Sequence, residues 1–198
     1  MVSGPAIGVV ALQGAFGLHV DALSDCGAAV TTVRLPADLA RCDAIVLPGG
    51  ESTTMGKLLD SSGLRGPLGE RMLAGMPVFG TCAGLILCAR EVLDPVPNDA
   101  APFGVVDMCV RRNAYGRQVE SFEEDIEVAA IGAETFRAVF VRAPAVESTG
   151  PEVEVLGWQN GHAALAREGP VLVASFHPEL TGDRRIHRYF VDLAKESA

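Results

Sequence analysis

Apolar and β-branched residues in the first half of the chain fall into short runs that alternate with segments of helical spacing. The runs lie at 6–12, 29–35, 44–48 and 76–79, the lengths expected of strands buried inside a sheet. Helical spacing is found at 18–26, 64–73 and 83–91, and Ser52, Thr53 and Thr54 predict the capped start of another helix. This alternation predicts a parallel sheet with helices on both faces.

Beyond residue 102 the pattern changes to strand-like runs that follow one another closely. They lie at 103–113, 121–129, 136–144, 153–158, 162–167 and 171–176, with turn signals such as Asn160-Gly161 between them. Such spacing is typical of antiparallel or mixed strands. A closing helix is expected over 184–195, and residues 1–198 are expected to form one domain.

Charge and cysteine content narrow the class of protein. A formal net charge of -9 argues against a nucleic-acid-binding protein and against an anionic membrane surface. No apolar run approaches the roughly 18 residues of a membrane-spanning helix. The first apolar run has no basic segment before it, so it is interpreted as a strand rather than a signal peptide. Five cysteines without a CxxC pair favour a reducing cytoplasm over a disulfide framework or a zinc site.

A cysteine stands at a glycine-flanked corner in "GTCAG" (80–84), between a predicted strand and a predicted helix. Such a tight turn forces the central side chain outward at the carboxyl edge of a sheet, as the Gly-x-Ser-x-Gly elbow does for serine. The helix that follows favours a thiolate at Cys82, and the N–H of Ala83 is placed to face an oxyanion. A buried packing role for Cys82 is equally common on this pattern alone.

A thiol nucleophile needs a base and a group that orients the base. Of the four histidines, His177 directly follows a strong strand, and Glu179 is placed to accept its ring N–H. His19 and His187 lie in helical patterns and are interpreted as surface or packing residues. A purely structural pairing of His177 with Glu179 is the alternative.

Two glycines form a further element in "LPGGESTT" (47–54). Gly49 and Gly50 lie after a strand and before a capped helix, where successive backbone N–H groups make an anion-binding concavity. An ordinary strand–helix turn is the alternative. No Gly-Lys-Ser/Thr follows, so this is not a phosphate-binding loop.

With these elements in order, the sequence resembles the triad (class I) glutamine amidotransferases. The strings "ALQGAFG", "LPGGESTTMGKLL", "PVFGTCAGLILCA", "RRNAYGRQVESFE", "VFVRAP" and "SFHPELT" narrow the resemblance to the glutaminase subunits of pyridoxal 5'-phosphate synthase, over roughly residues 7–190. The resemblance implies an α/β three-layer fold: a mostly parallel central sheet with helices on both faces and additional antiparallel strands in the second half.

The resemblance also implies an activity, hydrolysis of L-glutamine to L-glutamate and ammonia through a cysteinyl thioester, with no cofactor and no metal. The ammonia passes to a separate synthase subunit in a large hetero-oligomer, and the glutaminase is weak until that partner docks. The implied catalytic residues are Cys82, His177 and Glu179; the substrate-binding residues Gly50, Glu51, Ser52, Arg112, Val141 and Arg142; the oxyanion residues Gly49, Gly50 and Ala83; and the partner and oxyanion loop Gln13 and Gly14.

Two departures from the family pattern bear on partner contact. Phe16-Gly17-Leu18 precedes His19 where charged residues are usual, and Gln159 stands where a histidine is usual. A solvated strand end is the alternative for Arg112, and a surface ion pair is the alternative for Arg142. Two other functions stay open, a different enzyme or redox sensor with a cysteine elbow and a subunit that binds glutamine without cleaving it. An enzyme using His177 as a base is expected to lose activity as that residue is protonated, near its reference pKa of ~6.5 as shifted by the coupling of Cys82, His177 and Glu179.

Overall fold

The structure of the protein is a computed structural model that describes residues 4–95, 101–112 and 121–197. Within these residues seven strands form the main sheet, in the order β10-β11-β12-β4-β3-β1-β2. Strands β12, β4, β3, β1 and β2 are parallel, and β10 and β11 add an antiparallel edge. Their bounds are β1 Ala6–Val10, β2 Ala29–Val33, β3 Ala44–Leu47, β4 Val78–Thr81, β10 Glu154–Gln159, β11 His162–Glu168 and β12 Val171–Ala174.

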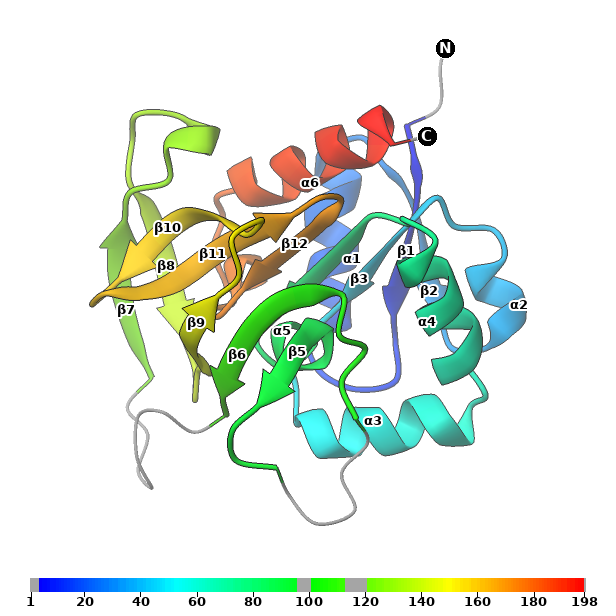
Figure 1. Ribbon diagram of the computed structural model, residues 1–198. Helices are drawn as coiled ribbons and strands as arrows, with labels where there is room; N and C mark the ends of the chain where they lie inside the picture. The colour runs from blue at the N-terminus through cyan, green and yellow to red at the C-terminus, as the bar shows by residue number, and fades with distance from the viewer. Residues whose placement is uncertain (1–3, 96–100, 113–120, 198) are drawn as a thin grey trace.

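Helices cover both faces of this sheet (Figure 1). Helices α1 (Phe16–Asp25) and α6 (Arg185–Glu196) lie on one face, and α3 (Ser52–Ser61), α4 (Arg65–Leu73) and α5 (Ala83–Cys88) lie on the other. Strand β3 shows why: Ile45 and Leu47 belong to the core of the α3–α5 face, whereas Val46 belongs to the core of the α1–α6 face. Successive side chains of a strand point to opposite faces, so an apolar run needs cover on both.

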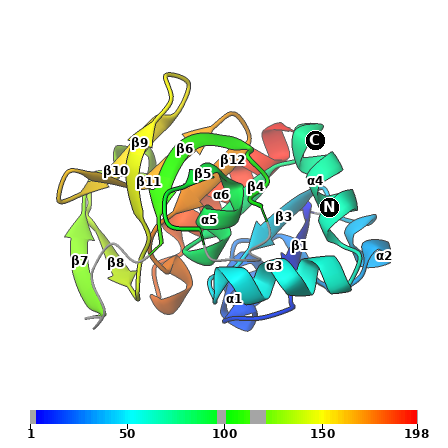
Figure 2. The same ribbon diagram turned by 60° about the horizontal axis from the view of Figure 1, so that its bottom comes forward.

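Smaller sheets flank the main one (Figure 2). Strands β5 (Ala89–Val92), β6 (Val106–Arg111) and β9 (Ala145–Thr149) form one, and β7 (Phe122–Ile126) pairs antiparallel with β8 (Phe136–Phe140). Asn160 and Gly161 have positive φ values of 46° and 81° and join β10 to β11 in a hairpin, as predicted. The predicted α/β class, with a mostly parallel sheet between helices and further antiparallel strands, is confirmed.

The structure differs from the predicted elements in three places. The helix expected over 83–91 ends at Cys88, because Ala89 turns to an extended conformation (ψ 154°) and pairs with Val106. The cap of α3 is Glu51, whose carboxylate accepts from the backbone N–H groups of Thr53 and Thr54, rather than the hydroxyl residues that follow it. The short helix α2 (Pro36–Leu39) and strand β9 were not expected. Of the motif at 111–123, residues 113–120 lie outside the described part of the chain.

The order of the parallel strands decides which loops meet at the carboxyl edge. Neighbouring strands β12, β4, β3 and β1 are followed by His177, Cys82, the Gly49-Gly50 turn and the Gln13-Gly14 turn respectively. Register keeps their ends level, since Ala174 pairs with Thr81 and Leu47 with Gly80. Open α/β sheets bind ligands at this edge. None of the helices in the described part of the chain has the length and hydropathy of a membrane-spanning segment.

Candidate active site

Cys82 occupies a sharp turn between β4 and α5. Its backbone has φ 49° and ψ -102°, a conformation that a non-glycine residue adopts only where the surroundings impose it. A Cβ at Gly80 would lie 2.7 Å from the carbonyl oxygen of Gly84, and a Cβ at Gly84 would collide with the carbonyl oxygen of Leu47. The two glycines therefore let α5 turn back against the sheet, which is the crowding predicted for this corner.

His177 and Glu179 follow β12, the strand beside β4. His177 Nδ1 lies 2.8 Å from Glu179 Oε1, and the His177 ring is close enough to Cys82 for the thiol to raise the pKa of the ring. The contact between His177 and Glu179 was expected from the two-residue period of an extended segment. It arises instead from a 3₁₀ turn, Pro178–Leu180, that begins directly after His177. The sulfur, the imidazole and the carboxylate thus form one chain of contacts.

The glycine turns on the neighbouring strands pack against this group. A Cβ at Gly49 would collide with the His177 ring, so glycine at this position leaves room for the imidazole. Gly14, at φ 82°, lies in turn against the carbonyl oxygen of Gly49. The Gln13 side chain reaches Gly50, with its amide carbon 3.4 Å from the position of a Cβ there. The two loops that sequence assigned to the oxyanion region are therefore in contact.

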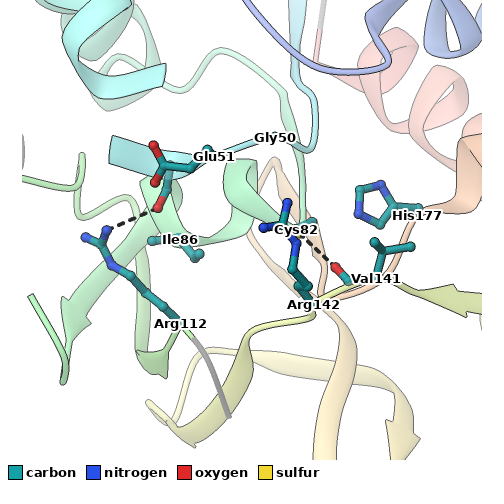
Figure 3. A pocket seen from close by; sticks show the side chains of 9 residues that line it. Gly50, Glu51, Cys82, Ile86, Arg112, Val141, Arg142 and His177 are labelled. Atoms are coloured by element: carbon teal, nitrogen blue, oxygen red, sulfur yellow. Dashed lines mark hydrogen bonds between the residues drawn. The ribbon is translucent and has the colours of Figure 1, made fainter. Parts of the chain in front are cut away.

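These loops surround an open cavity of about 200 Å³, a volume that suits an amino acid better than a nucleotide. Figure 3 shows His177 on one side of Cys82, with Arg112 and Glu51 on the other. The cavity is lined by Gly50, Glu51, Ser52, Cys82, Ile86, Arg112, Val141, Arg142 and His177. Every residue that sequence assigned to substrate binding is among them, and Ile86 is an addition.

The cationic and acidic side chains of the cavity have defined places. Arg112 Nη1 lies 3.2 Å from Ser52 Oγ and 3.0 Å from Thr53 Oγ1, so its guanidinium is held at the start of α3 rather than in solvent. Arg142 has φ 44° and follows Val141, whose carbonyl oxygen lies 3.9 Å from Cys82 Sγ. Desolvation opposes ionisation of Glu51, but hydrogen bonds from the first turn of α3 lower its pKa to about 2.

Electrostatics make His177 a cation at neutral pH. Burial alone would lower its pKa, but the hydrogen bonds to Cys82 and Glu179 raise that pKa to about 10. Burial likewise would raise the pKa of Glu179, but the hydrogen bond from His177 lowers it below its ordinary value. By contrast, burial raises the pKa of the Cys88 thiol to about 12, which suits a packing residue. An imidazolium beside a sulfur is the pair that a cysteine nucleophile requires.

Sequence reasoning missed two histidines near this site. His19 and His187 were interpreted as surface or packing residues, yet both are fully buried and their rings are hydrogen-bonded to each other. His19 Nε2 also lies 3.3 Å from Glu179 Oε2. The two histidines are 168 positions apart on different helices, so no local signal in the sequence pairs them.

Comparisons with known proteins identify the family of the chain. Residues 9–196 match the SNO glutamine amidotransferase family. Pyridoxal 5'-phosphate synthase subunit PdxT of Mycobacteroides abscessus is 52% identical over 191 residues, which cover 96% of this chain and 98% of that protein. The subunit of the same name from Acidothermus cellulolyticus is 51% identical and covers 98% of this chain and 96% of its own. A crystal structure of a glutamine amidotransferase superposes with a TM-score of 0.88 at 46% identity, covering 96% and 98% of the two chains.

Proposed function

The chain belongs to the SNO glutamine amidotransferase family, and on that premise we propose that Cys82, His177 and Glu179 are its catalytic residues. It is a glutaminase that hydrolyses L-glutamine to L-glutamate and ammonia, and it acts as the glutaminase subunit of pyridoxal 5'-phosphate synthase. The observation that carries the catalytic assignment is that Cys82 and His177 line the same cavity, with the His177 ring hydrogen-bonded to the Glu179 carboxylate behind it. The substrate is glutamine, and the Cys82, His177 and Glu179 side chains would cleave the C–N bond of its carboxamide.

In the proposed mechanism the Cys82 sulfur attacks the carboxamide carbon of glutamine. The negative charge that develops on the carboxamide oxygen is stabilised by the backbone N–H of Ala83 and by one from the Gly49-Gly50 turn. Loss of one such donor costs about 3 kcal/mol in other enzymes. The His177 imidazolium gives its proton to the departing nitrogen, which leaves as ammonia. A glutamyl thioester on Cys82 remains.

Hydrolysis of the thioester completes the cycle. His177, now neutral, accepts a proton from water, and the hydroxide attacks the thioester carbon. Cys82 leaves as a thiolate, His177 is again an imidazolium, and glutamate is released. Glu179 accepts the His177 Nδ1–H throughout, so that Nε2 is the nitrogen that exchanges protons with the reacting groups.

We propose that substrate is held on the side of the cavity away from His177. The guanidinium of Arg112 or of Arg142 suits the α-carboxylate of glutamine, because its donor fork matches two oxygens. Gly50, Ser52 and Val141 would contact the substrate along the cavity wall. The carboxylate of Glu51 accepts from Thr53 and Thr54, so its contribution to the site includes holding the start of α3 in place.

A labelling experiment on the complex with the synthase subunit tests the nucleophile. A glutamine analogue with a diazo ketone in place of the carboxamide is expected to alkylate Cys82 and to leave Cys26, Cys42, Cys88 and Cys109 free, because only Cys82 lines the cavity. Peptide mapping by mass spectrometry locates the adduct. Excess glutamine should prevent it, and a diazo ketone without the amino-acid part is the matched control. Adducts distributed over several cysteines, unaffected by glutamine, would remove Cys82 from this role.

The pH dependence differs from the sequence-based expectation. That expectation was a loss of activity as His177 is protonated, near ~6.5 and shifted by the coupling of Cys82, His177 and Glu179. In the structure Cys82 and Glu179 raise the pKa of the ring to about 10, so we place the change in activity on the alkaline side. The protonated ring is the form that donates to the leaving nitrogen, so kcat/KM is expected to be nearly constant between pH 6 and 8 and to fall as the pH approaches 10. Initial rates of ammonia release across this range check it, and a fall centred near pH 6.5 would contradict it.

Partner contact is proposed through the loop that carries Gln13 and Gly14. This loop packs on Gly49, so a synthase subunit docking there would act directly on the oxyanion turn. Leu18, just beyond the loop, is 41% exposed and offers apolar surface to such a partner. We further propose that residues 1–198 form one amidotransferase domain and that the complex with the synthase subunit is a large hetero-oligomer. The five free cysteines of the chain suit a cytoplasmic location, which we also propose.

A further inference from the structure

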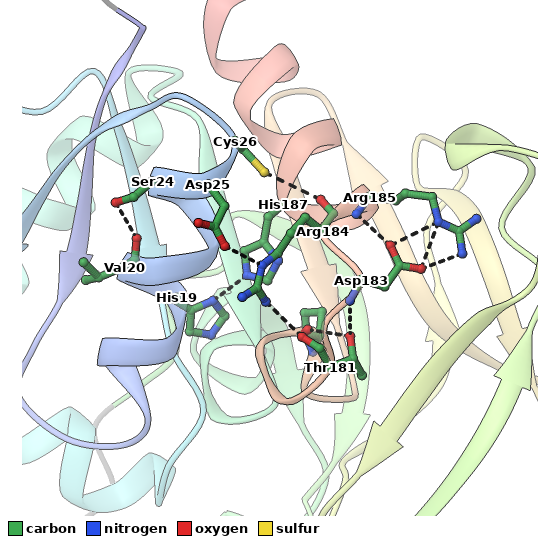
Figure 4. A network of polar contacts seen from close by, with 11 residues as sticks. His19, Val20, Ser24, Asp25, Cys26, Thr181, Asp183, Arg184, Arg185 and His187 are labelled. Carbon is green, nitrogen blue, oxygen red and sulfur yellow. Dashed lines mark hydrogen bonds and ion pairs between the residues drawn. The ribbon is translucent and has the colours of Figure 1, made fainter.

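A buried polar chain continues the catalytic group away from the cavity. His19 of α1 and His187 of α6 point toward one another, with His19 Nδ1 3.0 Å from His187 Nε2 (Figure 4). Both side chains are completely buried, and the Phe79 ring lies edge-on to each of them at 6.1 Å and 5.8 Å. An apolar interior retains polar side chains only where they have partners, so this pair calls for a physical explanation.

The other ring nitrogen of His19 faces the catalytic carboxylate. His19 Nε2 lies 3.3 Å from Glu179 Oε2 and 3.3 Å from the hydroxyl oxygen of Thr81, the residue directly before Cys82. Glu179 Oε1 is engaged by His177, whereas Oε2 has no aligned hydrogen-bond donor among the described residues. The interaction of His19 Nε2 with Glu179 Oε2 is therefore electrostatic, and it stabilises a buried oxygen that lacks a hydrogen-bond donor among those residues.

The direction of the hydrogen bonds follows from the chemistry of the acceptor. An ionised carboxylate only accepts, and the lone pair of a ring nitrogen at 3.3 Å would repel it, so His19 Nε2 carries the proton. His19 Nδ1 is then an acceptor, and His187 Nε2 is its donor. His187 Nδ1 then has a buried lone pair with no hydrogen-bond partner among the described residues. An unpaired buried acceptor destabilises the fold less than an unpaired buried N–H does.

Both histidines are neutral at neutral pH. Burial lowers the pKa of His19 to about 4, with Glu179 raising it and His177 lowering it further. Burial also lowers the pKa of His187 well below its ordinary value, and His19 and Arg184 act in the same direction. The titratable groups that face the pair are thus Glu179, His177 and Arg184, and the dipole of a neutral imidazole, rather than a charge, is what reaches Glu179.

We propose that His19 is a positioning residue for catalysis, which holds the Glu179 carboxylate ionised and directed at His177, and that His187 fixes the His19 tautomer required for this. The proposal rests on the proposed function of His177 and Glu179. Its consequence is specific: without the His19 N–H the Glu179 carboxylate can turn, its hydrogen bond with His177 Nδ1–H weakens, and the protonated His177 ring is supported less well. His177 then loses its proton at a lower pH.

Two amide variants separate this role from packing. The amide of His19→Gln reaches the position of Nε2 and can donate to Glu179, whereas the shorter amide of His19→Asn reaches only the position of Nδ1 and keeps an acceptor for His187. Both are polar; Asn has a helix propensity close to that of His, and Gln is the better helix former. The midpoint of His177 titration, followed by NMR of ¹³C-labelled histidine on the intact chain, is expected to fall by about one pH unit, a tenfold change, in His19→Asn. It should stay within about 0.3 units in His19→Gln.

His162 serves as an internal control in the same spectra, since its ring contacts the Val146 carbonyl oxygen and no member of the chain. A second readout is kcat/KM in the complex: a midpoint lowered by one unit from about 10 should cost His19→Asn about fivefold near pH 10, about twofold near pH 9 and little near pH 7. An unchanged His177 midpoint in folded His19→Asn, or an equal fall in both amide variants, overturns the proposal. If His19→Asn does not fold, His187→Asn is measured; it frees His19 to reverse its tautomer, and an unchanged midpoint there overturns the proposal too. The NMR result stands apart from the Cys82 chemistry, so it distinguishes failure of this proposal from failure of the proposed function.

Discussion

Replacement of Cys82 by alanine is expected to lower the rate of glutamine hydrolysis by about ten-thousandfold or more, as removal of a catalytic nucleophile does elsewhere. Cys82 lies at the turn where β4 meets α5, in contact with His177 and open to the cavity. Alanine removes the sulfur that would form the thioester and leaves the turn with a side chain of similar size. The measurement is ammonia release from glutamine with the synthase subunit present.

Cys88→Ala is the matched control for this variant. Cys88 belongs to the same helix and is also buried, but burial raises its pKa to about 12 and it does not face the cavity. Its replacement is expected to leave kcat/KM within about twofold of the wild type and to cost about 1 kcal/mol of stability. Equal rates for Cys82→Ala and the wild type would end the catalytic assignment.

Replacement of Gly84 by alanine is expected to destabilise the fold by about 3 kcal/mol or more, at the upper end of what overpacking costs. The added methyl group would collide with the backbone carbonyl oxygen of Leu47, which is part of β3 and cannot move as a flexible side chain could. Relief requires α5 to lift from the sheet, and that movement takes Cys82 away from His177. Chemical denaturation measures the free energy of unfolding, and the same samples report activity.

Gly69→Ala is the matched control for the substitution in α5. Gly69 also lies in a helix, α4, but a Cβ there would meet only the Phe103 ring, at an ordinary contact distance of 3.4 Å. Alanine is the better helix former, so this variant is expected to gain about 0.5–1 kcal/mol. Wild-type stability in Gly84→Ala would show that the corner is less crowded than the contact indicates.

Prediction of the elements from sequence succeeded where the signal was local. The apolar runs that became β1, β3, β4 and β12 needed only their own residues to be recognised, because a strand buried on both faces must be continuously apolar. The helix expected over 83–91 failed at its end, since residues 89–92 pair with β6 and that pairing outweighs helical spacing. Strand β9 was missed for the same reason, because its partner β6 is remote in the sequence.

The sequence by itself determined the corner at Cys82 and the turn at Gly49, because the close approach of backbone at Gly84 and of the His177 ring at Gly49 leaves room only for glycine. Only the tertiary structure decided what surrounds Glu179. His19, Thr81 and His187 come from α1, β4 and α6, and nothing in the spacing of their residues links them. They meet because α1 and α6 pack on the same face of the sheet beside β4, and side-chain contacts between elements far apart in the chain follow from that packing alone.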